Sequence, residues 1–201
     1  NFPFKDRDPR FYHDIVFDGF QYIHGAAGDR EAYVYCQLYT GGNMRPVANG
    51  SRTGYFIQKL VPHTCNVIDR DYDWGAAVHV YLPYMRLADV YLMYAEAAAA
   101  KDAGFSRSNK SSKCSLTSED AINKVRARCG AGEVHAKFTG TAYMDEIRRE
   151  RAVELMFEGH RFSALQRWLL LTAAPYTIKT SHEADRAQAE AWSQTNAPTP
   201  P

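Results

Sequence analysis

The stretch that decides the fold is Ile147-Arg148-Arg149-Glu150-Arg151-Ala152-Val153-Glu154-Leu155-Met156-Phe157-Glu158-Gly159-His160-Arg161-Phe162. Its carboxylates at Glu150, Glu154 and Glu158 recur at steps of four, which places them on one face of a helix. Three carboxylates in a row could bind a metal ion or act in acid–base catalysis. Four arginines are interleaved with them: Arg148, Arg149, Arg151 and Arg161. We therefore interpret the acidic face as part of an ion-pair network that fixes this helix against its neighbours.

Apolar residues of the same region extend the helical pattern: Ile147, Ala152, Leu155, Met156, Phe162, Leu165 and Leu169. They predict a helical region that starts near Thr141 and ends before Pro175. Gly159 interrupts it, at a cost of about 1 kcal/mol relative to alanine. It therefore marks either a close backbone approach or a break between two helices. No second histidine stands at ligand spacing from His160, so we expect a structural, hydrogen-bonding role for that side chain.

Upstream, the segment Met85–Ala103 is predicted to be a helix. Its apolar residues recur at steps of three and four: Leu87, Val90, Tyr91, Tyr94 and Ala98. Pro83 precedes it, at a place where proline is tolerated, and Gly104 is the expected stop. The polar, serine-rich segment Lys101–Leu116 that follows is predicted to be a loop.

A second helix is predicted to begin at Thr117. Thr117 and Asp120 have the spacing of a capping box, in which each side chain accepts a hydrogen bond from the other residue's backbone N–H; Ser118 is an alternative cap. The apolar stripe of this helix consists of Ala121, Ile122, Val125 and Cys129. Gly130 is the expected stop.

The chain divides by composition into a loop-rich region, a helical region and a tail. Residues 1–83 are rich in glycine, proline and tyrosine, without the pattern of a long helix. Three apolar runs there predict short strands or extended loops: Ile15–Phe17, Tyr33–Tyr39 and Tyr55–Val61. Residues 84–172 are helical and residues 181–201 form a polar tail, with a short helix expected around Glu183–Trp192. The predicted fold is mainly α, with helix pairs of the tetratricopeptide type and a loop-rich region carrying short strands.

Composition excludes several functions. The net charge of the 201 residues is +1, so there is neither the basic face that nucleic acid requires nor a polybasic cluster for anionic lipid. The longest apolar run, Val90–Ala100, contains Glu96 and does not predict a membrane span. The four cysteines are Cys36, Cys65, Cys114 and Cys129. Their spacing argues against a zinc site, and it leaves two disulfides or free thiols open.

The segment Asp69–Gly75 is the candidate ligand-binding loop. It combines hydrogen-bonding side chains with two aromatic rings immediately before the first predicted helix. Aromatic faces stack on sugar rings, and carboxylates hydrogen-bond to hydroxyl groups. We therefore expect Asp71, Tyr72 and Trp74 to contact a carbohydrate. The alternative is a loop in which Trp74 only closes the edge of the core.

Several segments resemble, in order, motifs of the SusD/RagB family. They are Asp6–Tyr12 (R-D-P-R), Thr53–Lys59 (T-G-Y-x-x-x-K), Arg86–Ala97 (R-x-A-E/D-V-x-L-M-Y-A-E-A), Asn123–Arg128 (N-x-V-R-x-R), Ile147–Phe162 (I-x-x-E-R-x-x-E-L-x-F-E-G-x-R-F) and Leu165–Trp168 (L-x-R-W). Together they extend over residues 6–168. In family terms, residues 1–201 correspond to the C-terminal portion of a SusD/RagB-like domain. After Trp168 the sequence departs from the family pattern, which puts the completeness of the C-terminus in question.

The resemblance implies a cell-surface lipoprotein of the outer membrane that captures a nutrient, usually an oligosaccharide. It implies a TonB-dependent, SusC-like transporter as partner, with the lipoprotein acting as a lid, and membrane attachment only through a lipid anchor outside this stretch. It implies neither a cofactor nor a metal nor catalysis, so we expect no enzyme. The family's ligand residues lie in variable loops, and none is transferred to this chain.

Two other functions remain open from the sequence. Some relatives are thought to serve peptide uptake, and helix-pair scaffolds bind extended peptides in their concave faces. A glycan hydrolase would need two carboxylates about 5 Å apart, one with a raised pKa, and nothing in the sequence points to such a pair.

Overall fold

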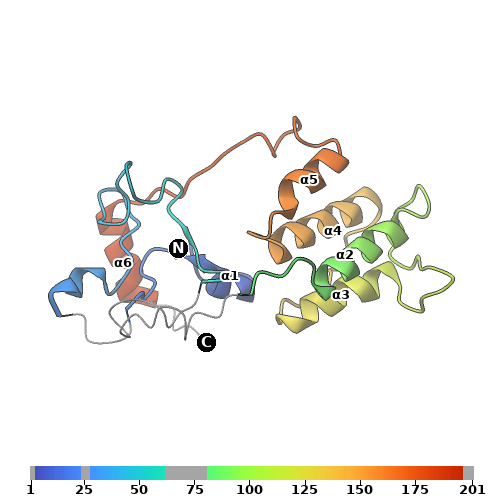
Figure 1. Cartoon of the computed structure of the whole chain (residues 1–201), viewed down its shortest axis with the longest axis horizontal. Helices are drawn as coiled ribbons and strands as arrows, with labels where there is room; N and C mark the ends of the chain where they lie inside the picture. Colours follow the sequence, from blue (N-terminus) through green and yellow to red (C-terminus); the bar gives the residue numbers. More distant parts are fainter. Residues whose placement is uncertain (1–2, 24–27, 62–80, 197–201) are drawn as a thin grey trace. The chain divides into compact units, whose positions relative to one another are not determined.

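The computed structural model describes residues 3–23, 28–61 and 81–196 (Figure 1). The chain divides into two compact units. The helical unit comprises residues 83–177, and the loop-rich unit combines residues 1–82 with residues 178–201.

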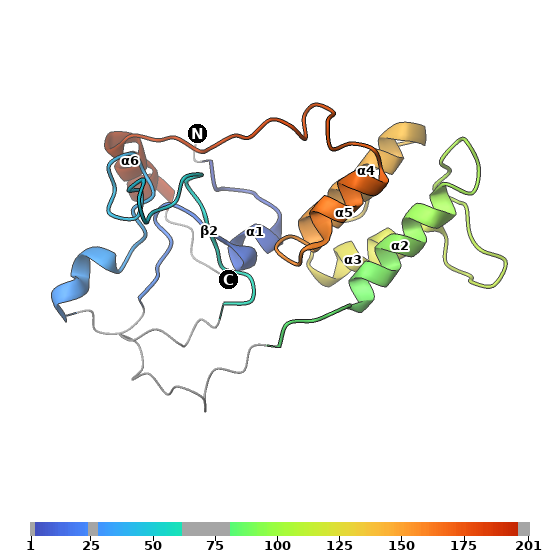
Figure 2. The ribbon, with the colours of Figure 1, turned by 45° about the horizontal axis from the view of Figure 1, so that its top comes forward.

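The helical unit contains α2 (Leu87–Ala99), α3 (Ser118–Arg128), α4 (Gly140–Glu154) and α5 (His160–Arg167). The loop after α2 reverses the chain, so that α3 runs back beside α2, and α4 packs against this pair (Figures 1 and 2). The core consists of Leu92, Ala95, Ala99, Ala121, Ile122, Val125, Val134, Tyr143, Met144, Ile147 and Leu155. The predicted mainly helical fold, with packed helix pairs, is confirmed.

A polar contact joins three of these helices inside the core. The side chain of Ser118 is inaccessible to solvent, and its hydroxyl donates to the carbonyl oxygen of Ala95 at 2.7 Å. The same hydroxyl shares a hydrogen bond of 2.9 Å with the hydroxyl of Tyr143. The small side chains of Ala95 and Ala99 let α3 approach α2 closely.

The predicted caps of α3 are confirmed. The Thr117 hydroxyl accepts from the Asp120 N–H at 3.1 Å, and the Asp120 carboxylate accepts from the Thr117 N–H at 2.8 Å. At the other end Gly130 has φ +69°, a conformation that glycine adopts without strain. Ala131 N–H donates to Arg126 O and Gly130 N–H to Ala127 O, which forms a Schellman motif.

The predicted end of the first helix is wrong. The helix α2 ends at Ala99 instead of continuing to Ala103, and Gly104 does not cap it. The carboxylate of Asp102 accepts the Gly104 N–H at 3.0 Å, which favours a turn over another helical turn. This turn directs Phe105 back onto the core.

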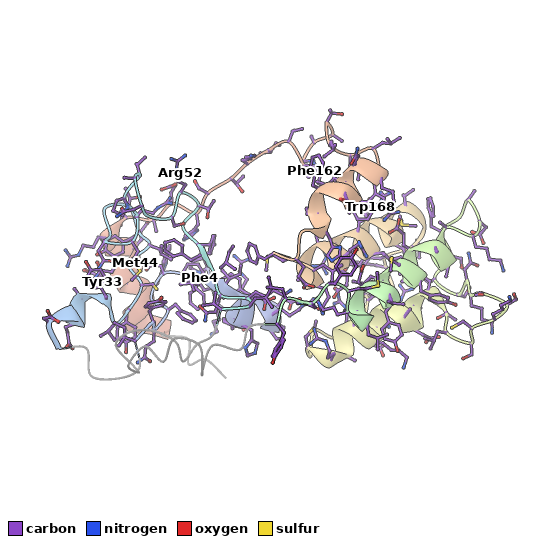
Figure 3. All side chains as sticks on the ribbon, in the orientation of Figure 1. Phe4, Tyr33, Met44, Arg52, Phe162 and Trp168 are labelled. Atoms are coloured by element: carbon purple, nitrogen blue, oxygen red, sulfur yellow. The ribbon has the colours of Figure 1, made fainter. Side chains whose placement is uncertain are left out.

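Gly159 lies at a break between two helices. It has φ +80° at the N-cap of α5, and a Cβ atom there would meet nothing within 4 Å. Of the two interpretations of this glycine, the break is therefore correct. Because α5 starts anew after the break, the predicted apolar stripe does not stay buried: Phe162 is 66% and Leu169 is 87% exposed (Figure 3). Ala164 is the buried residue of α5.

The loop-rich unit contains α1 (Pro9–Asp14), β1 (Ile15–Val16), the 3₁₀ helix η1 (Gly28–Tyr33), β2 (Phe56–Ile57) and α6 (Arg186–Asn196). The strands pair antiparallel, with Ile15 opposite Ile57 and Val16 opposite Phe56. Two of the three predicted extended runs therefore contain strands. The third contributes only a bridge between Tyr35 and Gln21. The tail helix begins three residues later than expected, at Arg186.

We expect Thr117→Ala to lower the free energy of unfolding by about 1 kcal/mol, because it removes the oxygen that accepts the Asp120 N–H. The matched control is Thr139→Ala, since Thr139 is the N-cap of α4 but its side chain makes no capping hydrogen bond. Urea unfolding followed by circular dichroism would measure both. Equal losses in the two variants would contradict the capping role of Thr117.

Candidate functional site

The predicted ligand residues Asp71, Tyr72 and Trp74 lie outside the described residues. The described residues resume at Tyr81, before α2. Tyr81 is 83% and Tyr84 is 96% exposed there. Two exposed aromatic rings therefore lie shortly after the candidate loop in the sequence.

The acidic face of α4 contains deeply buried charge. The Glu150 side chain is 0% exposed, and its carboxylate accepts from Arg126 of α3 at 2.8 Å. Arg126 also lies 3.4 Å from Glu146 and donates to the backbone oxygens of Gly132 and Ala131. This arginine therefore joins the face of α4 to α3 and to the loop that follows α3.

The other two carboxylates converge on Arg86, which immediately precedes α2. Glu158 lies in the turn after α4, so the predicted helical face ends at Glu154. Arg86 lies 2.5 Å from Glu154 and 2.7 Å from Glu158, and it also donates to the backbone oxygen of Glu154. Arg128 adds a second guanidinium, 2.7 Å from Glu154. The prediction of an ion-pair network that fixes α4 against its neighbours is confirmed, with partners from the ends of α2 and α3.

Two further ion pairs connect α2 with α4 and with the end of α5. Arg151 of α4 lies 2.5 Å from Asp89. Arg167 and the Trp168 indole N–H both donate to the carboxylate of Glu96, at 2.5 to 2.8 Å. Burial by itself would raise the pKa of Glu96, but these donated hydrogen bonds outweigh it and hold that pKa below its ordinary value. Glu96 is therefore an ionised structural anchor and not a proton donor.

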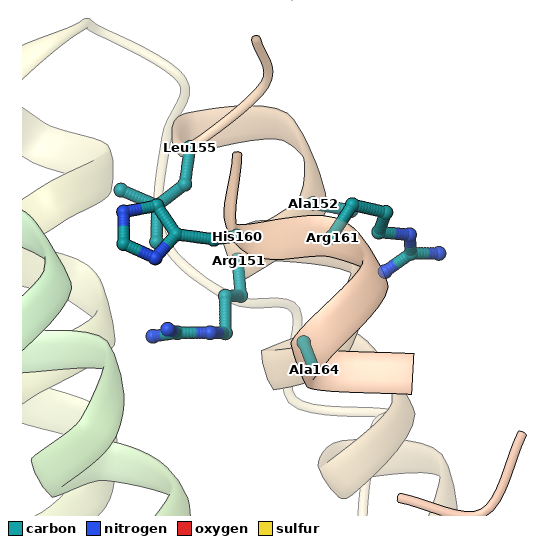
Figure 4. Close-up of a pocket in the computed structure, with 6 residues that line it drawn as sticks. All are labelled: Arg151, Ala152, Leu155, His160, Arg161 and Ala164. Atoms are coloured by element: carbon teal, nitrogen blue, oxygen red, sulfur yellow. The ribbon is translucent and has the colours of Figure 1, made fainter. Parts of the chain in front are cut away.

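The space around His160 is too small for a ligand. A hollow of about 10 Å³ between the end of α4 and α5 leaves room for about one water molecule. Figure 4 shows the residues that line it: Arg151, Ala152, Leu155, His160, Arg161 and Ala164. The imidazole of His160 makes no hydrogen bond within the described part of the chain, so the side-chain hydrogen bond expected from the sequence is not present.

Among residues 3–23, 28–61 and 81–196, histidine, cysteine, aspartate and glutamate side chains form no group that could hold a metal ion. Cys36, Cys114 and Cys129 are free thiols, and Cys65 lies outside the described residues. Burial raises the pKa of the Cys36 thiol to about 12, so this thiol is not reactive at neutral pH. The helices of the described residues are each too short or too polar to cross a bilayer.

Sequence reasoning missed one cluster, in the loop-rich unit. The rings of Phe11, Phe17, Tyr55, His182 and Trp192 surround Phe4, which is inaccessible to solvent. These residues come from distant parts of the chain, and no local pattern links them. Their aromatic character was the available signal, and it does not specify which rings meet.

Comparison with known proteins places the chain in a family. The sequence model of the SusD family matches residues 1–200. A SusD-like protein from Bacteroides fragilis, solved by crystallography, resembles this chain with a TM-score of 0.61 and 27% sequence identity. The match covers 84% of this chain but 29% of that protein's chain, so this chain spans less than a third of its length. Curated protein sequences contain no significant match.

We expect Arg126→Ala to lower the free energy of unfolding by about 3 kcal/mol, because the buried Glu150 carboxylate then loses the guanidinium that donates to it. Arg149→Ala is the matched control, since the Arg149 side chain is 52% exposed and its buried partner Glu146 keeps Arg126 at 3.4 Å. Its effect should stay within about 0.5 kcal/mol. Chemical denaturation at neutral pH would compare them, and similar losses would show that the burial of Glu150 does not set the strength of this contact.

Proposed function

The chain belongs to the SusD family, and from this membership we propose that it is part of an outer-membrane protein that captures oligosaccharides at the cell surface. The captured glycan passes to a TonB-dependent, SusC-like transporter, and a lipid anchor outside these residues attaches the protein to the membrane. The observation that carries the proposal is the family match over residues 1–200, together with the shared fold.

The chemistry of the helical unit supports binding without catalysis, and proteins of this family are binding proteins. A retaining glycosidase requires two carboxylates about 5 Å apart, one as nucleophile and one as acid. The buried carboxylates Glu150 and Glu154 are instead paired with arginines, which occupy their oxygens. These pairs fix α4 against α3 and against Arg86 at the start of α2.

We place ligand contact in the segment Asp69–Gly75 and the residues that follow it. The tyrosines at 81 and 84 are exposed, and tyrosine offers a flat apolar face with a hydroxyl at its edge. This combination suits a sugar ring, whose axial C–H groups stack on an aromatic face while its hydroxyls form hydrogen bonds. Trp74 and Tyr72 would supply the stacking surfaces and Asp71 a hydrogen-bond acceptor.

We expect Trp74→Ala to weaken glycan binding by about tenfold, because one stacked aromatic ring contributes on the order of 1 kcal/mol beyond the area it buries. A glycan array on the intact protein would identify the ligand, and isothermal titration would measure the variant. The matched control is Tyr33→Ala, an exposed ring in η1 that is 47% accessible. Unchanged affinity in the Trp74 variant would move the site away from this loop.

A second candidate function is capture of extended peptides, which scaffolds of stacked helix pairs bind in their concave faces; α2 and α3 form a packed pair of this kind. Binding to peptides, with none to any glycan, would replace the first proposal by this one. Affinity purification from membranes tests the partner separately. Recovery of a TonB-dependent transporter supports either ligand, and its repeated absence would contradict the uptake role.

A further inference from the structure

In the loop-rich unit, the C-terminal segment is fastened to the loop before β2 through its backbone. His182 N–H donates to Thr53 O at 2.8 Å, and the Thr40 N–H donates to Ala184 O at 2.8 Å. Arg45 adds a hydrogen bond to His182 O and an ion pair of 2.5 Å with Glu183. The fit is close, since a Cβ atom on Gly54 would lie 2.6 Å from His182 O.

The side chain of His182 occupies an unusual position within this contact. Its ring centroid lies 5.3 Å from Phe4, 5.8 Å from Tyr55 and 5.7 Å from Trp192. Its Nε2 atom is buried and has no hydrogen-bond partner within the described part of the chain. A neutral imidazole tolerates such surroundings, whereas a protonated one would bring a charge and a second N–H donor into them.

Two acidic and two basic side chains act on the charge of this ring. Asp18, after β1, and Glu183, on the same segment, are acidic; Arg7, before α1, and Arg45, before β2, are basic. The Asp18 carboxylate already accepts two backbone N–H groups, those of Leu38 and Tyr39. None of these four side chains forms a hydrogen bond to the imidazole, so none of them is placed to accept a hydrogen bond from the second N–H of a protonated ring.

We propose that His182 is a pH-sensitive latch that holds the C-terminal segment, residues 178–196, onto the loop before β2 while its ring is neutral and releases it on acidification. Release would uncover the rings of Phe4 and Tyr55, which His182 and Trp192 now cover. Acid would thus expose an apolar surface in the loop-rich unit.

The direction of titration agrees with this geometry. Burial is the largest influence on His182 and lowers its pKa below the ordinary value; Asp18 acts in the opposite direction but does not reverse it. A histidine with a lowered pKa in the folded state stabilises that state above its unfolded pKa of about 6.5. This stabilisation is lost as the pH falls through the lowered folded value.

The first test follows the imidazole of His182 by NMR in the intact protein. We expect it to titrate below the value of an unfolded reference peptide. Titration at or above that value would overturn the proposal, because it would mean that the surrounding rings favour the cation. This measurement uses the unaltered protein, so it does not depend on whether a variant folds.

The second test compares hydrogen exchange at pH 7.5 and 5.5, corrected for the intrinsic pH dependence of exchange. We expect the amides of residues 181–185 and the Thr40 amide to lose up to about tenfold protection at the lower pH, which is the most that one histidine with an unfolded pKa of about 6.5 can contribute between these two values. His182→Phe should keep its protection at both values, while His13→Gln, a change at an exposed histidine of α1, should behave as the unaltered protein. Protection that is retained by the unaltered protein at pH 5.5, or lost equally by His182→Phe, would overturn the latch.

Discussion

Two carboxylates that solvent does not reach, those of Glu150 and Glu154, constrain the helical unit more than any other groups. An ionised carboxylate inside a protein is tolerated only when hydrogen-bonding cations surround it. Arg126 approaches from α3, and Arg86 from the residue before α2. Helix α4 can therefore occupy one position relative to both neighbours, because a rotation or a shift by one turn would separate charges that have no water to replace their partners. Apolar residues of similar volume could fill the same space with equal stability, but they would specify the register less sharply.

The loop-rich unit is held by different means. Its strands are two residues each, and its packing relies on tilted and edge-on contacts among aromatic rings around Phe4. Contacts between rings tolerate small rotations. The backbone hydrogen bonds of the C-terminal segment are directional, and they fix its position against the loop before β2. A rigid helical frame and a more adaptable loop-rich unit are thus built from different interactions in one chain. The candidate binding loop falls within the sequence of the loop-rich unit, shortly before the first residues of the helical unit.

Local chemistry made much of the frame predictable. The capping box at Thr117, the stop at Gly130 and the break at Gly159 each depend on a few adjacent residues. The sequence predicted the first two and gave the break as one of two interpretations of Gly159. The end of α2 was missed because the Asp102 side chain accepts a backbone hydrogen bond and so favours a turn over a further helical turn. The exposure of Phe162 was missed because the helical pattern does not continue in phase across the break at Gly159. The partners of the acidic face could not be assigned, since spacing along one helix does not reveal which arginine another helix presents. The ring cluster around Phe4 could not be predicted either, because it depends on contacts between the two ends of the loop-rich unit's sequence. Ligand contact by Asp71, Tyr72 and Trp74 stays a prediction, because these residues lie outside the described ones.

The order of the two units along the chain has a consequence for how the protein is made. The Thr40 side chain pairs with Glu183, 143 residues further on, and the whole helical unit lies between them. At about 5–20 residues per second, a ribosome needs on the order of ten seconds to cover that interval. The helical unit is one continuous stretch of the sequence, so it can begin to fold as soon as it emerges. Phe4 and its neighbours must wait for His182 and Trp192, so they are synthesised before the helical unit but are covered only after it.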